Sequence, residues 1–146
     1  DEAFGRWNVW RLYADPPYWE TQLAVWSGTY GHERVIAWRT NRDTPMVAAL
    51  RAFENAITAG ELSHDGSPAL SAHVGNSCRR NLVSRDKETG ARLWTIVKDR
   101  PNSVHKIDFA IAAVLSWEAR RDALAAGAEV DDEPSVYEER GVVWVG

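Results

Sequence analysis

Two aspartates, Asp108 and Asp15, are the residues whose positions in the sequence are best suited to chemistry. Asp108 lies in HKIDFAIAAVLSWEAR (105–120), where all residues from 107 to 115 except Asp108 are apolar. On a helical wheel it shares a face with Ile111, Ala112, Leu115 and Ala119. Burying an unpaired carboxylate raises its pKa or costs several kcal/mol, which predicts a metal ion or a basic partner such as Lys106. The alternative is an ordinary acid that favours a helix N-terminus.

Asp15 is the second candidate, because it lies at the predicted end of a strand. It follows VWRLYA (9–14), which has strand character, and it precedes Pro16 and Pro17, which cannot continue a sheet ladder. Ligands of α/β sheets bind at the carboxyl ends of strands, which is where we expect Asp15. The alternative is that Asp before Pro simply opens a turn.

Two carboxylates brought together from a strand end and a helix start would suit Mg²⁺ or Mn²⁺, which prefer oxygen ligands. The corresponding chemistry is metal-assisted phosphodiester hydrolysis. His105 and Lys106 are further candidates for contact with a phosphate, although solvation of a helix start explains them as well. His64 and His73 form no ligand triad in sequence and are assigned to a turn and a helix surface. Nothing marks Cys78 as an activated nucleophile.

Composition limits the classes of protein that remain. The 146 residues are 45% hydrophobic and 26% charged, which is typical of one globular domain. A single cysteine excludes a disulfide framework and a cysteine-rich zinc site. No apolar run approaches the roughly 18 residues of a membrane span, and the amino terminus lacks the features of a signal peptide. The absence of an initial Met predicts a processed or excised piece.

The net charge of −4 conceals a basic segment. Residues 79–106 contain eight bases and three acids, whereas residues 129–139 contain six acids and no base. Such a patch can meet phosphates without reading bases, although a solvated charged hairpin is an equally good interpretation. The candidate contacts to the DNA backbone are Arg79, Arg80, Arg85, Lys87, Arg92 and Lys106.

Alternating strand and helix patterns predict an α/β domain with a mixed sheet flanked by helices. We expect strands at 9–15, 34–39, 82–86 and 92–98 and helices from 19 to Gly28 or Gly31, from 44 to before Gly60, from 67 to about 81, and from 102 or 103 to about 126. Trp94 and Trp117 are expected in the core. The domain is expected to end at 127 and to be followed by an acidic linker and tail, 128–146.

Three blocks that occur in order resemble one family. LYADPPYWETQLAVWSGTYG, WRTNRDTPMVAALRAFENAITAGELSHDG and KIDFAIAAVLSWEARRDAL are together similar to the C-terminal nuclease domain of the large terminase subunit of tailed bacteriophages, in the group common among phages and prophages of actinobacteria. The similarity covers about 11–126. It implies an RNase H-like fold and a divalent-metal endonuclease that cuts concatemeric double-stranded DNA during packaging, in the cytoplasm of the host bacterium.

The resemblance also assigns roles to the two aspartates. The family site has three acids, of which Asp15 in YADPP matches the second and Asp108 in KIDFA matches the third, as ligands of Mg²⁺ or Mn²⁺. The first acid has no counterpart, so the chain is expected to begin inside the domain, to lack its first strands and to cleave weakly or not at all. The packaging ATPase, whose phosphate loop is absent here, the small terminase subunit and the portal are the partners implied for the intact parent.

Two other functions are compatible with the same residues. One is a different RNase H-like nuclease, of the resolvase or transposase type. The other is a non-catalytic piece that binds DNA or a packaging partner after loss of the first acid.

Overall fold

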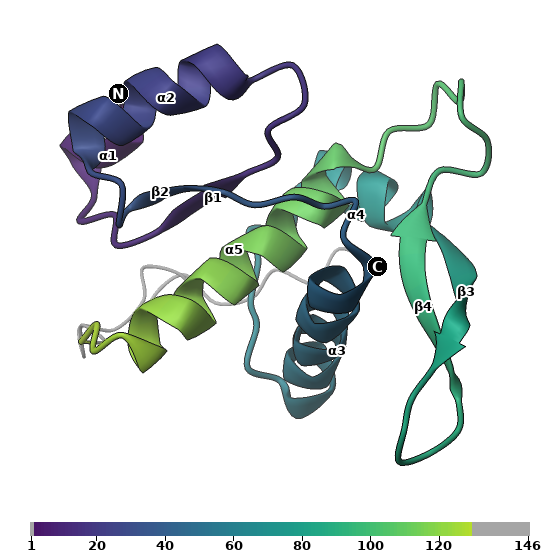
Figure 1. Ribbon diagram of the computed structural model, residues 1–146. Helices are drawn as coiled ribbons and strands as arrows, with labels where there is room; N and C mark the ends of the chain where they lie inside the picture. Colours follow the sequence, from purple (N-terminus) through teal and green to yellow (C-terminus); the bar gives the residue numbers. More distant parts are fainter. Residues whose placement is uncertain (1, 130–146) are drawn as a thin grey trace.

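Helix α5 (Asp108–Ala125) is the longest element and lies across the middle of the molecule, between a parallel strand pair and a β-hairpin (Figure 1). The computed structural model describes residues 2–129. The other elements are α1 (Glu2–Arg6), β1 (Leu12–Ala14), α2 (Glu20–Tyr30), β2 (Val35–Ala37), α3 (Asp43–Ala59), α4 (Pro68–Gly75), β3 (Cys78–Arg85) and β4 (Arg92–Val97). None of the helices within 2–129 is long and apolar enough to cross a membrane.

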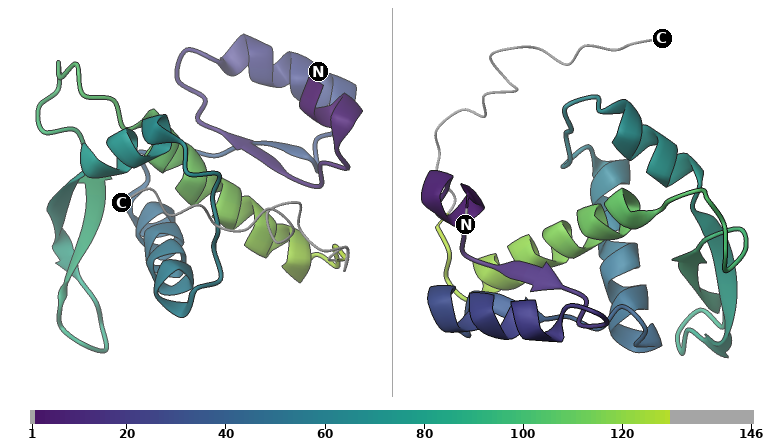
Figure 2. Two further views of the ribbon diagram at one scale, coloured as in Figure 1. Left: turned by 180° about the vertical axis from the view of Figure 1, so that it is seen from behind. Right: turned by 90° about the horizontal axis from the view of Figure 1, so that it is seen from above.

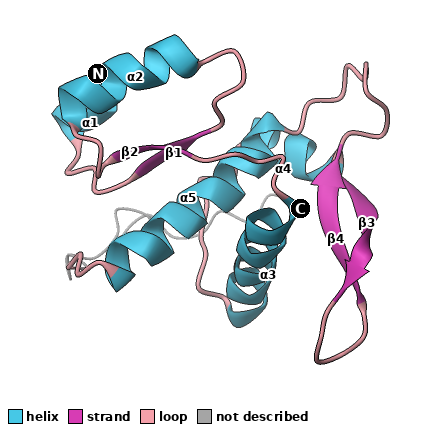
Figure 3. Cartoon of the chain, viewed as in Figure 1, coloured by secondary structure: helices cyan, strands magenta, loops and turns pink. Residues whose placement is uncertain are grey.

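The strands form two separate sheets, which Figure 3 shows on opposite sides of α5. β1 pairs with β2 in parallel, with Tyr13 opposite Ile36, and β3 pairs with β4 in an antiparallel hairpin. The α/β class is therefore as expected, but within residues 2–129 the strands do not join into the single mixed sheet that we predicted. The hairpin instead packs against α3, and α5 lies between the two strand pairs (Figure 2).

The core lies where α3 crosses α5. Met46, Ala49 and Leu50 of α3 are buried against Val114 of α5. The apolar stripe of α3 predicts this face, and the helix ends as expected at Gly60, whose φ of 73° lies in the left-handed region that favours glycine. The residues that surround this core are Trp38, Phe53, Trp94, Ile96 and Ile111.

The two tryptophans expected in the core differ in burial. Trp117 is buried, and the guanidinium of Arg120 lies 4.9 Å from its ring centroid. Trp94 is half-buried, since one side packs on the core and the Arg79 guanidinium lies 4.7 Å from its ring. Both side chains thus contribute to packing, as predicted.

The strand predicted from residue 9 begins at Leu12, and two predicted helix boundaries are wrong. The helix predicted to reach about residue 81 ends at Gly75, because Cys78 to Asn81 pair with Val97 to Trp94 as part of β3. The last helix begins at Asp108 rather than after Pro101, and Ser103 is buried in the preceding loop, where its hydroxyl accepts a hydrogen bond from the His105 amide at 3.1 Å. Of the predicted linker and tail, residues 130–146 lie outside the described part of the chain.

Asp86 holds the turn of the hairpin and ties it to α3. Its carboxylate accepts hydrogen bonds from the Thr89 amide at 2.8 Å and the Thr89 hydroxyl at 3.0 Å, and it pairs with the Arg51 guanidinium at 2.7 Å. The Thr89 amide contributes most, followed by Arg51, and together they hold the pKa of Asp86 well below its usual range.

We expect Asp86→Asn to destabilise the chain at pH 7 and to lose this effect in acid. A lowered folded-state pKa stabilises the fold above the unfolded-state value of about 3.9 and ceases to do so as the pH falls towards the folded-state value. Thermal midpoints of the wild type and the variant, measured from pH 7 to pH 2, should therefore converge below about pH 4. Asp65→Asn, which removes a charge from another exposed turn, serves as the control. A gap of constant size across this pH range would contradict the assignment.

Candidate functional site

Asp15 and Asp108 line the same cleft, although they are far apart in the sequence. The cleft has a volume of about 810 Å³ and is bounded by the ends of β1 and β4, the start of α5, and the loop that joins β4 to α5. Thr40, Arg80, Lys98, Asp99 and Arg100 contribute to its wall. The structure thus brings together the two carboxylates that the sequence singled out.

Asp15 directly follows β1 and is held by Thr40, which lies three residues beyond the end of the neighbouring parallel strand β2. The Thr40 hydroxyl donates a hydrogen bond to one carboxylate oxygen, and the Thr40 amide donates to the other at 3.4 Å. The Trp38 amide donates to the Ala14 carbonyl at 2.9 Å, which continues the parallel pairing up to this point. Asp15 is half-buried. The two hydrogen bonds from Thr40 orient its carboxylate near the carboxyl ends of β1 and β2, where α/β sheets bind ligands.

Asp108 is exposed, and the expectation that it is buried on an apolar face was wrong. The helix begins at this residue, so the helical face that the wheel predicts has not yet entered the core. Ile111, Ala112 and Leu115, which the wheel places with Asp108, line the same cleft. The apolar face is therefore real, and near its first turn it forms part of the cleft wall.

The donor type of the two aspartates fits a divalent cation, but two side chains do not complete a site. Among residues 2–129, no group of three or more His, Cys, Asp or Glu is arranged to hold a metal ion. Asp99, a cleft residue that sequence reasoning did not single out, is engaged by its own loop. A hydrogen bond from Ser103 is the main cause that lowers the pKa of Asp99, and the His105 ring nitrogen lies 3.9 Å from its carboxylate.

The six predicted DNA contacts are all exposed, but the structure separates them. Arg80 lines the cleft, whereas its neighbour Arg79 lies over Trp94 on the other face of the hairpin, because successive strand residues point to opposite faces. Arg85 donates to the Gly90 carbonyl at 2.9 Å, near the hairpin turn that carries Lys87. Arg92, at the start of β4, and Lys106, two residues before α5, also lie outside the cleft lining.

Lys98 and Arg100 are cleft cations that sequence reasoning counted in the basic segment but did not select. They follow the carboxyl end of β4 and line the same cleft as Asp15 and Asp108. Because β4 belongs to an antiparallel hairpin, the rule for the carboxyl ends of parallel strands that pointed to Asp15 does not select them. The cleft thus combines acidic and basic side chains, an arrangement suited to a phosphate ester with a bound cation.

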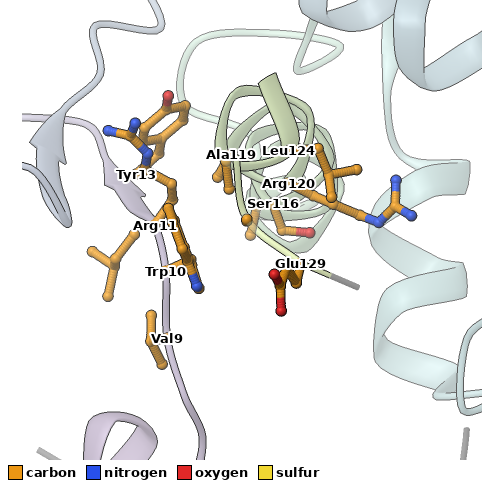
Figure 4. A pocket seen from close by; sticks show the side chains of 13 residues that line it. Val9, Trp10, Arg11, Tyr13, Ser116, Ala119, Arg120, Leu124 and Glu129 are labelled. Atoms are coloured by element: carbon orange, nitrogen blue, oxygen red, sulfur yellow. The ribbon is translucent and has the colours of Figure 1, made fainter. Parts of the chain in front are cut away.

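A second groove, of about 470 Å³, runs between β1 and α5 (Figure 4). Trp10, Arg11 and Tyr13 line one side of it, and Ser116 and Ala119 line the other. No residue of β2 lines it, so the groove follows the side of β1 that β2 does not cover. Within residues 2–129, β1 pairs with no other strand.

Tyr13 fastens β1 to α5 beside this groove. Its hydroxyl donates a hydrogen bond to the carboxylate of Asp122. Burial, followed by this hydrogen bond to Asp122, raises the pKa of Tyr13. The contact fixes the separation of β1 and α5, and thereby the width of the groove between them.

Comparison with known proteins finds similarity to bacteriophage proteins. It is 30% identical to the gene 13 protein of Mycobacterium phage D29 over 133 residues, covering 84% of this chain and 21% of the relative. It is 29% identical to the gene 13 protein of Mycobacterium phage L5 with the same coverage. No family model matches, and no solved structure matches. The chain therefore resembles about a fifth of the length of these phage proteins, whose names state no activity.

Proposed function

We propose that this chain is part of the RNase H-like nuclease domain of a phage terminase large subunit, a divalent-metal endonuclease that cuts concatemeric DNA. The observation that supports this proposal best is the shared cleft. A carboxylate at the end of a parallel strand, Asp15, and one at the start of a helix, Asp108, line this cleft together with Arg80 and Lys98. The similarity to mycobacteriophage proteins agrees with a phage origin.

The proposed roles follow from the contacts of each residue. Asp15, whose orientation is set by Thr40, and Asp108, at the exposed start of α5, would hold Mg²⁺ or Mn²⁺. When bound, such an ion supplies Lewis-acid chemistry for phosphodiester hydrolysis. Arg80 and Lys98 would hold the DNA backbone through charge, which needs no particular base sequence.

A third acidic ligand would come from elsewhere in a longer protein. The chain spans about a fifth of the length of its relatives. Within residues 2–129, the side of β1 away from β2 has no strand partner. Such an edge is a template for pairing with another strand. We infer that a strand carrying this acid lies along β1, in the groove beside Arg11 and Tyr13 (Figure 4).

The partners and location follow from the same proposal. Double-stranded DNA is the substrate, and the ATPase domain, the small terminase subunit and the portal would be partners of the complete protein in the host cytoplasm. A second candidate function is a DNA-binding piece that does not cleave, which is favoured by the lack of a three-ligand group within residues 2–129.

Nicking of supercoiled plasmid with Mn²⁺ tests the proposal. The protein should comprise this chain joined to the upstream part of its own coding sequence, with the chain alone assayed in parallel. We expect the longer protein to cut and Asp108→Ala to abolish cutting, with little or no cleavage by the chain alone.

Asp43→Ala is the matched control, since Asp43 is also an exposed acid at the first position of a long helix but does not line the cleft. It should cut like the wild type. If the longer protein binds DNA but never cuts, the non-catalytic function replaces the nuclease. If Asp108→Ala cuts normally, the assigned site is wrong.

A further inference from the structure

Helix α5 begins without a cap from its own sequence. Its N-cap residue is Ile107, which makes no side-chain capping hydrogen bond. The first amides of a helix have no intrahelical partner, and Ser, Thr, Asp or Asn commonly satisfies one of them at the N-cap. The position of Asp108, the first residue of the helix, therefore depends on contacts from outside the segment.

Helix α4 and its C-cap residue, Asn76, supply these contacts on both sides of Asp108. The Phe109 amide donates a hydrogen bond to Nδ1 of His73 at 2.9 Å, so this imidazole acts as a cap from a distance. The His73 ring also packs on the Phe109 ring, with 4.6 Å between centroids. Nδ2 of Asn76 donates to the Lys106 carbonyl at 3.0 Å, which secures the chain just before the helix.

We propose that His73 and Asn76 are positioning residues that fix the Asp108 carboxylate in the cleft. They hold residues 106 and 109, and the chain between these two points contains only Ile107, which is buried, and Asp108. Neither residue lines the cleft, so both act through the backbone that carries the carboxylate. The role in metal binding rests on the proposed function, whereas the capping role does not.

The proposal specifies the chemical form of His73. Because the partner is a backbone N–H group, Nδ1 must be an acceptor, so the neutral ring carries its proton on Nε2. Asn offers the closest replacement, since its Oδ1 is separated from the backbone by the same number of bonds as Nδ1 of His. His73→Asn should therefore preserve the cap, and His73→Ala should remove it.

Amide hydrogen exchange and NMR of the metal-free chain test the capping role. In the wild type, we expect the Nε2–H tautomer of His73 and a protected Phe109 amide. Exchange at Phe109 should accelerate about tenfold in His73→Ala, in line with the loss of one cap, and should return towards the wild-type rate in His73→Asn. His64→Ala is the matched control, because Nδ1 of His64 also accepts from a backbone amide, that of Gly66 at 3.0 Å, in the loop between α3 and α4. Equal Phe109 exchange in His73→Ala and the wild type would overturn the proposal.

Titration with Mn²⁺ alone, followed by electron paramagnetic resonance, tests the consequence for Asp108. Changes to groups that orient a metal ligand commonly weaken metal binding by about 10- to 100-fold, which is what we expect for His73→Ala and Asn76→Ala. His73→Asn should recover most of the affinity. If the wild type binds no Mn²⁺ while Phe109 exchange responds as described, the metal-binding proposal fails and the capping role stands. Unchanged Mn²⁺ affinity in both alanine variants would show that Asp108 is positioned by other contacts.

Discussion

Replacing Arg80 and Lys98 together by alanine should weaken binding of the chain to double-stranded DNA and make it less sensitive to salt. Each side chain lines the cleft, and each would neutralise one phosphate of the backbone. Loss of a phosphate contact lowers the slope of log K against log salt by about 0.9, so the double variant should lose about two units of slope. The loss should be similar for DNA of any sequence, since phosphate contacts carry no base information.

Fluorescence anisotropy with a labelled duplex, measured at several salt concentrations, checks this result. The matched control is Lys87→Ala with Arg92→Ala, which removes the same charge from the same hairpin but outside the cleft. The control should lose less affinity and less slope than the cleft variant. If both pairs lose the same amount, DNA lies along the whole hairpin and the cleft is not its specific site.

Leu50→Ala should remove a large part of the stability of the fold. Leu50 is 4% exposed and belongs to the cluster that joins α3 to α5. Truncating a buried leucine loses its transfer free energy and leaves a cavity, at a cost of about 2–5 kcal/mol. Domains of this size are stable by only about 5–15 kcal/mol, so the variant should unfold at a much lower urea concentration.

Urea denaturation followed by tryptophan fluorescence measures this cost. Ile57→Ala is the control on the same helix, because Ile57 is 57% exposed. Its effect should stay within about 0.5 kcal/mol, as for most surface substitutions. A loss at Ile57 as large as that at Leu50 would mean that α3 packs through a different face.

The elements with local signals were predicted best. Helix α3 has its apolar stripe and a glycine beyond its end, and β1 stops at two prolines, so nearest neighbours in sequence largely decide them. The stretch from 76 to 81 was misassigned because β3 is held by pairing with β4, which local propensity does not contain. The start of α5 was misplaced for a similar reason, since the contacts that hold it come from His73 of α4 and from Asn76, just after α4.

The candidate site divides in the same way. Asp15 could be selected from sequence because a strand end is a local feature, and Asp108 because it is the one charged residue in an apolar run. Their meeting in one cleft, the exposure of Asp108 and the inclusion of Lys98 depend on how β1, β4 and α5 pack. The sequence pattern treated Arg79 and Arg80 alike, and the pairing of β3 with β4 placed them on opposite faces.

By itself, the sequence determined the α/β class, the helix that builds the core and the two aspartates most able to do chemistry. Only the tertiary structure decided which cations join them, that the strands form two separate pairs within residues 2–129, and that His73 caps the helix of Asp108. The physical reason is the separation along the sequence over which each kind of interaction acts. Propensities, caps and hydrophobic periodicity act over a few residues, whereas a cleft and a distant cap are made by groups that meet only when remote segments pack.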